Sequence, residues 1–204
     1  MKKAGFLCIV AAVVLSSCVG VDSHLTIRQD GSGTLALTYR VSQLVVNLGN
    51  PVDGKGVIPL PLARADFERS VAGSHGTVRL TAFDRSEDQK DVTIRVELAF
   101  DSLDALAKLD AFQGAQIRFS SDGASHSFSQ LIAKAPREPI TEDSLRMVDA
   151  FFGDYDLVFA IEAPQPVKSN TLGTLSQDRR VLTYKTSVKD LVRTKDDVIV
   201  SVTW

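Results

Sequence analysis

Strict alternation of polar and apolar residues is the feature that most limits what this chain can fold into. Residues 34–41 place Leu, Leu, Tyr and Val at every second position, with Thr, Ala, Thr and Arg between them. Residues 92–100 repeat the pattern with Val, Ile, Val, Leu and Phe. Because successive side chains of a strand point to opposite faces, both segments predict strands with one buried face and one face in water. Such strands are typical of antiparallel sheets.

Turn residues between the alternating segments predict that the strands are joined as successive hairpins. The turns are Asp30-Gly31-Ser32-Gly33, a polar loop at 84–91 and a third turn at 121–123. The run at 155–161 is more continuously apolar, which predicts a central strand covered on both faces. The expected strands are 25–28, 34–41, 78–82, 92–100, 117–119, a segment near 128, 155–161, 182–184 and 198–204.

Helices are fewer, and capping residues mark their ends. Asp101 or Ser102 and then Thr141 are N-cap candidates, and Gly73 and Gly153 follow expected helix ends. The expected helices are about 61–72, 102–112 and 141–152, with one or two turns each at 42–48 and 187–193. Hairpins with interspersed helices predict an α+β fold, in which about three helices pack on one face of an antiparallel sheet. We expect a single domain over 22–204.

The composition of the chain excludes two classes of electrostatic partner. Of 204 residues, 44% are hydrophobic and 24% are charged, which is ordinary for a globular chain with a sizeable core. There are 23 Lys+Arg against 25 Asp+Glu, a formal net charge of −2, and no run of like charge. The sequence therefore lacks a nucleic-acid footprint, and it also lacks a polybasic membrane patch.

The N-terminal segment has the pattern of a secretion signal. Lys2 and Lys3 precede an apolar run over 4–15, which at 12 residues is shorter than the roughly 20 that span a bilayer. Ser16, Ser17 and Cys18 follow the run. An ordinary secretory signal with a chance cysteine, or an uncleaved anchor, would also account for the apolar run.

Leu15-Ser16-Ser17-Cys18 resembles the lipobox of bacterial lipoproteins position by position. The resemblance implies removal of residues 1–17 as a signal peptide, attachment of a diacylglycerol to the Cys18 sulfur, and often acylation of the new amino group, for instance with palmitate. Residues 18–21 would then be a lipidated cysteine and a short tether. Two or three acyl chains hold a protein stably on a membrane, at about 0.8 kcal/mol per buried CH₂. Cys8 lies in the removed segment, so the mature chain would have no free thiol.

The two ends of the chain also resemble LppM-like envelope lipoproteins. The pattern is a lipobox cysteine, an almost immediate strand with a D-G-S-G turn, and VLTYKTSVKDL followed by a strand ending in Trp204. The resemblance implies an α+β fold and a lipid or glycolipid ligand, and it carries over one functional residue, Cys18. Because the first strand is expected to begin at about 22–25, we expect the domain to lie against the bilayer.

The motifs of the chain predict no catalytic, cofactor or metal site. His24, His75 and His126 each follow a serine but are far apart in sequence, whereas zinc ligands usually include close pairs. A Ser/His/Asp triad stays open because its members can come from anywhere in a chain, although no G-x-S-x-G motif is present. D-G-S-G at 30–33 and D-G-K-G at 53–56 do not complete a phosphate-binding loop. We therefore expect no enzyme and leave the role of the histidines open.

Two long loops are candidate partner surfaces. Residues 47–62 mix Pro and Gly with apolar residues, which suits a lid or a partner surface, or a loop that covers the core. Residues 163–178 form a second long connection, which would border the same end of the sheet or be a mobile hairpin loop.

The expected function follows from the anchor. We expect a cell-envelope lipoprotein, on the periplasmic or surface face, whose soluble domain binds a lipid, a glycan or an envelope protein near the membrane. Val19 at the second mature position allows an outer membrane. The alternative is a structural or assembly lipoprotein that acts through a protein-interaction surface. A third reading, an envelope enzyme, would bring a histidine within hydrogen-bond reach of a carboxylate in a cleft.

Overall fold

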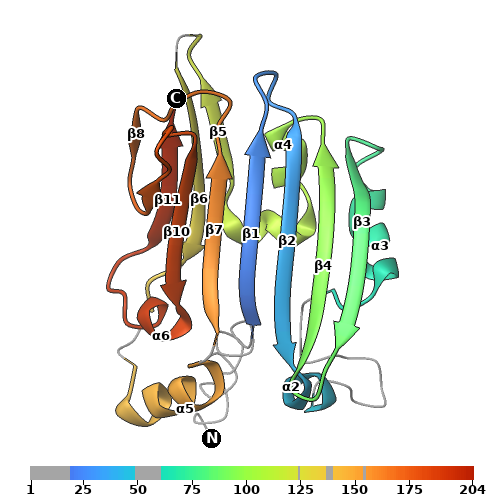
Figure 1. The fold of residues 1–204 in the computed structure, drawn as a ribbon, viewed down its shortest axis with the longest axis vertical. Helices are drawn as coiled ribbons and strands as arrows, with labels where there is room; N and C mark the ends of the chain where they lie inside the picture. Colours follow the sequence, from blue (N-terminus) through green and yellow to red (C-terminus); the bar gives the residue numbers. More distant parts are fainter. Residues whose placement is uncertain (1–18, 49–60, 124, 137–139, 154) are drawn as a thin grey trace, which may run out of the picture.

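The computed structural model describes residues 19–48, 61–123, 125–136, 140–153 and 155–204. The predicted signal peptide 1–17 and Cys18 lie outside the described residues, as do positions 49–60 of the first long loop. The described residues form two β-sheets accompanied by helices (Figure 1). The predicted α+β class is confirmed.

The larger sheet, sheet A, has seven strands in the order β3-β4-β2-β1-β7-β10-β9. Neighbouring strands are antiparallel except β1 and β7, which run parallel. The three predicted hairpins are all present, two of them in this sheet. The strands of sheet A are β1 (Val19–Ile27), β2 (Gly33–Ser42), β3 (Val78–Glu87), β4 (Asp91–Phe100), β7 (Asp156–Glu162), β9 (Thr174–Leu175) and β10 (Val181–Ser187).

The smaller sheet, sheet B, is antiparallel and has the order β5-β6-β11-β8. The sequence predicted one sheet, whereas the third hairpin pairs with the C-terminal strand to make a second one. Phe128, Val202 and Trp204 of this second sheet belong to the same buried cluster as Leu25 and Ile161 of sheet A. Stacking therefore buries the apolar face of each sheet against the other. The strands of sheet B are β5 (Arg118–Ser121), β6 (His126–Ala133), β8 (Ser169–Asn170) and β11 (Val198–Thr203).

Sheet A has one buried face and one open face, as the alternation predicts. On β2, Leu35 and Tyr39 are buried, while Ala36 and Arg40, the residues that follow them, are exposed. Residues paired across neighbouring strands share a face, so β1 and β4 have the same buried face and the same open face as β2. The expectation that β7 is covered on both faces is wrong, because Val158 and Ala160 are only partly buried on the open face. β7 is nevertheless central, since it lies between β1 and β10.

The helices are arranged in three places. α3 packs beside β3, with the rings of Phe67 and Phe83 5.7 Å apart. α4 contacts β4 of sheet A and β5 of sheet B, and η1 contacts β6 of sheet B. α5 and α6 share a small cluster of Val148, Phe152 and Val188. The helices are α2 (Gln43–Leu48), α3 (Arg64–Ala72), α4 (Leu103–Ala107), η1 (Asp110–Ala115), α5 (Glu142–Phe152) and α6 (Val188–Leu191).

Two local differences from the sequence prediction have physical causes. The helix expected over 102–112 is divided into α4 and the 3₁₀ turn η1, because Leu109 between them adopts an extended backbone. Leu103, Leu106 and Leu109 are nonetheless buried as predicted. β1 begins at Val19, so residues 19–21, which were expected to be tether, already belong to the strand. They pair with β2, where Val41 is fully buried.

Candidate functional site

The end of sheet A at which β1 begins is the first candidate, because the predicted lipidation site is the residue before β1. We call this end of sheet A the Val19 end: β1, β4 and β7 begin there, and β2, β3 and β10 end there. Figure 1 shows α2, α5 and α6 at the same end and the C-terminus at the opposite one. Cys18 itself lies outside the described residues.

Gly20 is held tightly in the second position of β1. A Cβ atom on Gly20 would lie 3.1 Å from the ring of Tyr155 and 3.4 Å from the guanidinium of Arg40. The approach to Tyr155 is tighter than ordinary van der Waals contact, and the approach to Arg40 is at its lower limit. The absence of a side chain therefore lets Tyr155 pack directly on the beginning of the strand, two residues after Cys18.

Tyr155 anchors a buried polar contact beside Gly20. Its hydroxyl donates a hydrogen bond to Oδ1 of Asp91 at 2.5 Å, and Asp91 is only 5% exposed. Burial, followed by this bond to a carboxylate, raises the pKa of Tyr155 to about 12. The guanidinium carbon of Arg40 and Nζ of Lys90 lie 5.5 and 5.9 Å from the ring centroid. Both cations lie over the ring face, and the charge of Arg40 opposes part of the rise in the pKa of Tyr155.

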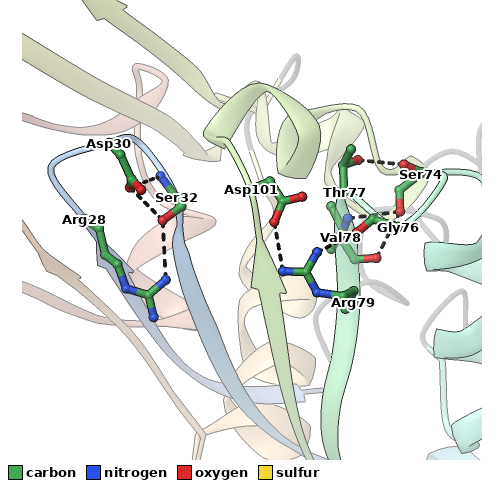
Figure 2. Close-up of polar contacts among 9 residues, drawn as sticks. All are labelled: Arg28, Asp30, Ser32, Ser74, Gly76, Thr77, Val78, Arg79 and Asp101. Atoms are coloured by element: carbon green, nitrogen blue, oxygen red, sulfur yellow. Dashed lines mark hydrogen bonds and ion pairs between the residues drawn. The ribbon is translucent and has the colours of Figure 1, made fainter.

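At the opposite end of sheet A, polar groups form hydrogen bonds and an ion pair with one another, as Figure 2 shows. Asp30 accepts hydrogen bonds from the backbone N–H and the hydroxyl of Ser32, at 3.0 and 2.7 Å. Arg79 binds Asp101 at 2.8 Å and lowers the pKa of that carboxyl. The D-G-S-G segment is thus a hairpin turn between β1 and β2, and the similar segment at 53–56 lies outside the described residues.

His24 is the histidine that meets a carboxylate. Its Nε2 lies 3.3 Å from Oε2 of Glu162, which also accepts a hydrogen bond from Thr26 at 3.1 Å. The side chains of His24 and Glu162 are 44% and 38% exposed on the open face of sheet A. Ser23 points to the buried face, so the adjacent serine is no partner of this histidine. The contact lies on an open sheet face, whereas the enzyme reading expected a cleft.

The other two histidines have structural surroundings. His75 lies in the exposed turn between α3 and β3, with a φ of 52°. The ring of His126 stacks on two aromatic rings that also contact each other, with its centroid 6.1 Å from that of Phe119 and 5.8 Å from that of Trp204. Across the described part of the chain, no group of three His, Cys, Asp or Glu side chains is placed to hold a metal ion. The structure does not bring the three histidines together.

A second candidate is an open depression of about 520 Å³ between α4 and the β5–β6 hairpin. Its lining is rich in hydroxyl groups and carries one positive and one negative side chain. The register pairs Arg118 with Ser129 and Ser120 with Ser127, so these four residues lie on the outer face of the hairpin. The lining residues are Asp104, Ile117, Arg118, Phe119, Ser120, Ser127 and Ser129.

The sequence did not single out any residue of this depression. α4 and the hairpin are separate elements, and their approach depends on packing that no local pattern encodes. One signal was present, because serines recur at every second position over 125–129, which is the outward face of a predicted strand.

Among the described residues, no helix is long and apolar enough to cross a membrane.

Comparison with known proteins gives one structural similarity. No protein-family model matches the chain, and no curated protein matches its sequence. The chain is similar to the NMR structure of the folded domain of the Mycobacterium tuberculosis LppM protein, with 14% identity and a TM-score of 0.48. The match covers 92% of this chain and 90% of that chain. The resemblance noted from the sequence is supported only as a weak structural similarity.

Proposed function

We propose that the chain is a bacterial envelope lipoprotein, anchored through lipid on Cys18, whose folded domain binds a partner close to the membrane surface. The observation that carries the proposal is the sequence Leu15-Ser16-Ser17-Cys18 immediately before a strand that begins at Val19. A lipobox followed directly by folded structure leaves no flexible tether between lipid and domain. The partner is a lipid, a glycan or another envelope protein.

The anchor is the main source of membrane affinity in this proposal. A diacylglycerol on the Cys18 sulfur and an acyl group on its amino nitrogen supply two or three chains, at about 0.8 kcal/mol per buried CH₂. Arg40 and Lys90 at the Val19 end add little, since Asp88 and Asp91 lie beside them. The lipid rather than surface charge would therefore decide attachment.

The attachment point orients the domain. Because β1 starts one residue after Cys18, the Val19 end would face the headgroups, and the depression on sheet B would remain open to the envelope space. Val19 as the second mature residue leaves both inner and outer membranes open as locations. No catalytic activity is proposed, since the histidine–carboxylate contact lies on the open sheet face.

The packing of the domain favours a surface site over a site in the core. Trp204, Phe128 and Phe100 are among the largest side chains that are fully buried, and they fill the space where the two sheets meet. This filled core supports the alternative of a structural or assembly lipoprotein, which would work through a protein-interaction surface. The depression on sheet B supports ligand binding.

Metabolic labelling of cells with a fatty-acid analogue tests the anchor. We expect label in the wild-type protein and none in Cys18→Ala, because the thioether needs the sulfur of Cys18. Cys8→Ala is the matched control, since it removes the other cysteine of the chain and should keep full label. Equal label in wild type and Cys18→Ala, or loss of label in Cys8→Ala alone, would contradict the proposal.

A further inference from the structure

Among the described residues, Arg118 of β5 has no carboxylate partner, in contrast to Arg79, Arg85 and Arg95 of sheet A. Arg79 binds Asp101 and Arg95 binds Asp84, at 2.8 and 3.1 Å, so their charges are neutralised within the domain. For Arg118, no ion pair occurs with any carboxylate of the described residues, although its side chain is exposed beside the depression. Its guanidinium is therefore free to bind an anionic group of a ligand.

Three serine hydroxyls lie on the same face of the hairpin as Arg118 and line the same depression. Ser129 lies directly opposite Arg118 on the neighbouring strand, and Ser127 lies opposite Ser120. Directly opposite residues of antiparallel strands have Cβ atoms about 4.5–5.5 Å apart. The Oγ atoms of Ser120 and Ser127 are 2.7 Å apart and share one hydrogen bond, which leaves each hydroxyl with further bonding capacity. The hairpin thus presents several donors and acceptors to the depression.

The other wall of the depression limits the ligand's charge. Asp104 of α4 is exposed and lines the same depression, where its carboxylate can accept hydrogen bonds from ligand hydroxyls. Because one cation and one anion face the same space, a ligand with several negative charges would be repelled. The side that faces α4 belongs to β5, the edge strand of sheet B, which has backbone groups not paired within the sheet.

From the juxtaposition of Arg118, three serine hydroxyls and Asp104, we propose that the depression binds a saccharide with a single anionic group. A volume of about 520 Å³ is within the range of small-molecule sites. Many closely spaced hydroxyls on the ligand match the serines and Asp104, and its carboxylate or phosphate matches Arg118. This inference rests on the proposed function, because the envelope location decides where the ligand is encountered. Of the lipid, glycan and protein partners proposed there, it selects a glycan.

The test is an NMR titration of the full-length processed protein in detergent micelles. The probes are cellobiose, its uronic acid cellobiouronic acid, and its phosphate ester cellobiose 6′-phosphate, which separate the neutral, carboxylate and phosphate cases. We expect the amide signals of residues 118–120 and 127–129 to shift, with at least one acidic probe binding about tenfold more tightly than cellobiose. Which acidic probe binds more tightly identifies the anionic group.

Two arginine variants make the result specific. Arg118→Ala should lower the affinity for the acidic probe to that for cellobiose, whereas Arg95→Ala, a matched loss of one exposed arginine on sheet A, should leave it unchanged. Equal binding of acidic and neutral probes to wild type would overturn the proposal, as would full acidic-probe affinity in Arg118→Ala or the absence of shifts in these amides. Fatty-acid label on the same preparations reports separately on Cys18, so failure of one claim is distinguishable from failure of the other.

Discussion

Individual glycines at the β1–β2 turn have different roles. Gly31 has a φ of 80°, in the left-handed region that glycine adopts without strain, and it closes the three-residue turn after Ile27 and Arg28. Gly33 is required for a different reason, which is close approach. A Cβ atom on Gly33 would lie 2.0 Å from the carbonyl oxygen of Thr26 and 2.5 Å from the ring of Phe100.

Gly33→Ala is therefore expected to destabilise the domain by about 1–3 kcal/mol, since both the strand pairing and a fully buried ring must move. Urea unfolding of the two proteins measures the difference. Gly73→Ala is the control, because its Cβ meets nothing within 4 Å at the end of α3. Equal stability of Gly33→Ala and wild type would show that the close approach does not constrain the fold.

The hydrogen bond between Tyr155 and Asp91 predicts a pH-dependent stability. The folded-state pKa of Tyr155 is raised to about 12 from an unfolded value near 10. Stabilisation by the neutral hydroxyl is complete below about pH 10 and is lost as the pH rises towards 12. At pH 7, Tyr155→Phe should cost about 1–3 kcal/mol, because a buried Asp91 oxygen loses its donor.

Urea unfolding at pH 7, 9, 10 and 11 tests this prediction. The difference between wild type and Tyr155→Phe should be constant up to about pH 10 and should shrink above it. Tyr184→Phe, a substitution at a partly buried tyrosine of β10, serves as the control for removing a hydroxyl from the sheet. A difference that grows with pH would contradict the sign, and no difference at pH 7 would contradict the role of the bond.

At the scale of elements, local signals were predictable and long-range pairings were not. Ser102, Thr141 and Ser187 each accept a backbone hydrogen bond at the helix starts that the sequence predicted. A cap and a hairpin turn are encoded by residues a few positions apart, so the chain itself displays them. The parallel pairing of β1 with β7 joins Val21 to Leu157, and nothing near either residue specifies that partner.

The same distinction explains what was missed at the candidate sites. Cys18 could be predicted as a lipidation site because the resemblance to a lipobox lies in four contiguous residues. Arg118 was not found, because its availability depends on where carboxylates from other elements lie. Division into two sheets likewise depends on β11 pairing with β6, as between Val202 and Phe128. Sequence patterning identifies buried faces, but it does not identify which other face covers them.

Ser102 provides a test of capping at the start of α4. Its Oγ accepts a hydrogen bond from the backbone N–H of Ala105 at 3.1 Å, which positions the buried Leu103 and Leu106. Ser102→Ala should lower the free energy of unfolding by about 1 kcal/mol, whereas Ser102→Asp should retain stability because aspartate also caps. Urea unfolding of the three proteins measures the free energy of unfolding. Identical free energies for Ser102→Ala and wild type would show that the cap is not needed.

The whole molecule has two functionally distinct ends in this account. β1 leaves the predicted lipid attachment point and runs nine residues, or roughly 30 Å at about 3.3 Å per residue, to the turn at Asp30 and Gly31. The C-terminus lies at that far end (Figure 1). A lipid on Cys18 would therefore hold the Val19 end at the headgroups and the β1–β2 turn well away from them.

Fluorescence quenching by a headgroup-attached quencher tests this orientation most directly. The mature sequence has no cysteine after Cys18, so single labels can be placed at Gln89→Cys in the β3–β4 turn and Gln29→Cys in the β1–β2 turn. Both glutamines are exposed, and the two turns lie at opposite ends of sheet A. With the lipidated protein in bilayers, the account predicts strong quenching of the label at 89 and weak quenching of the label at 29. Equal quenching at the two positions, or stronger quenching at 29, would contradict it.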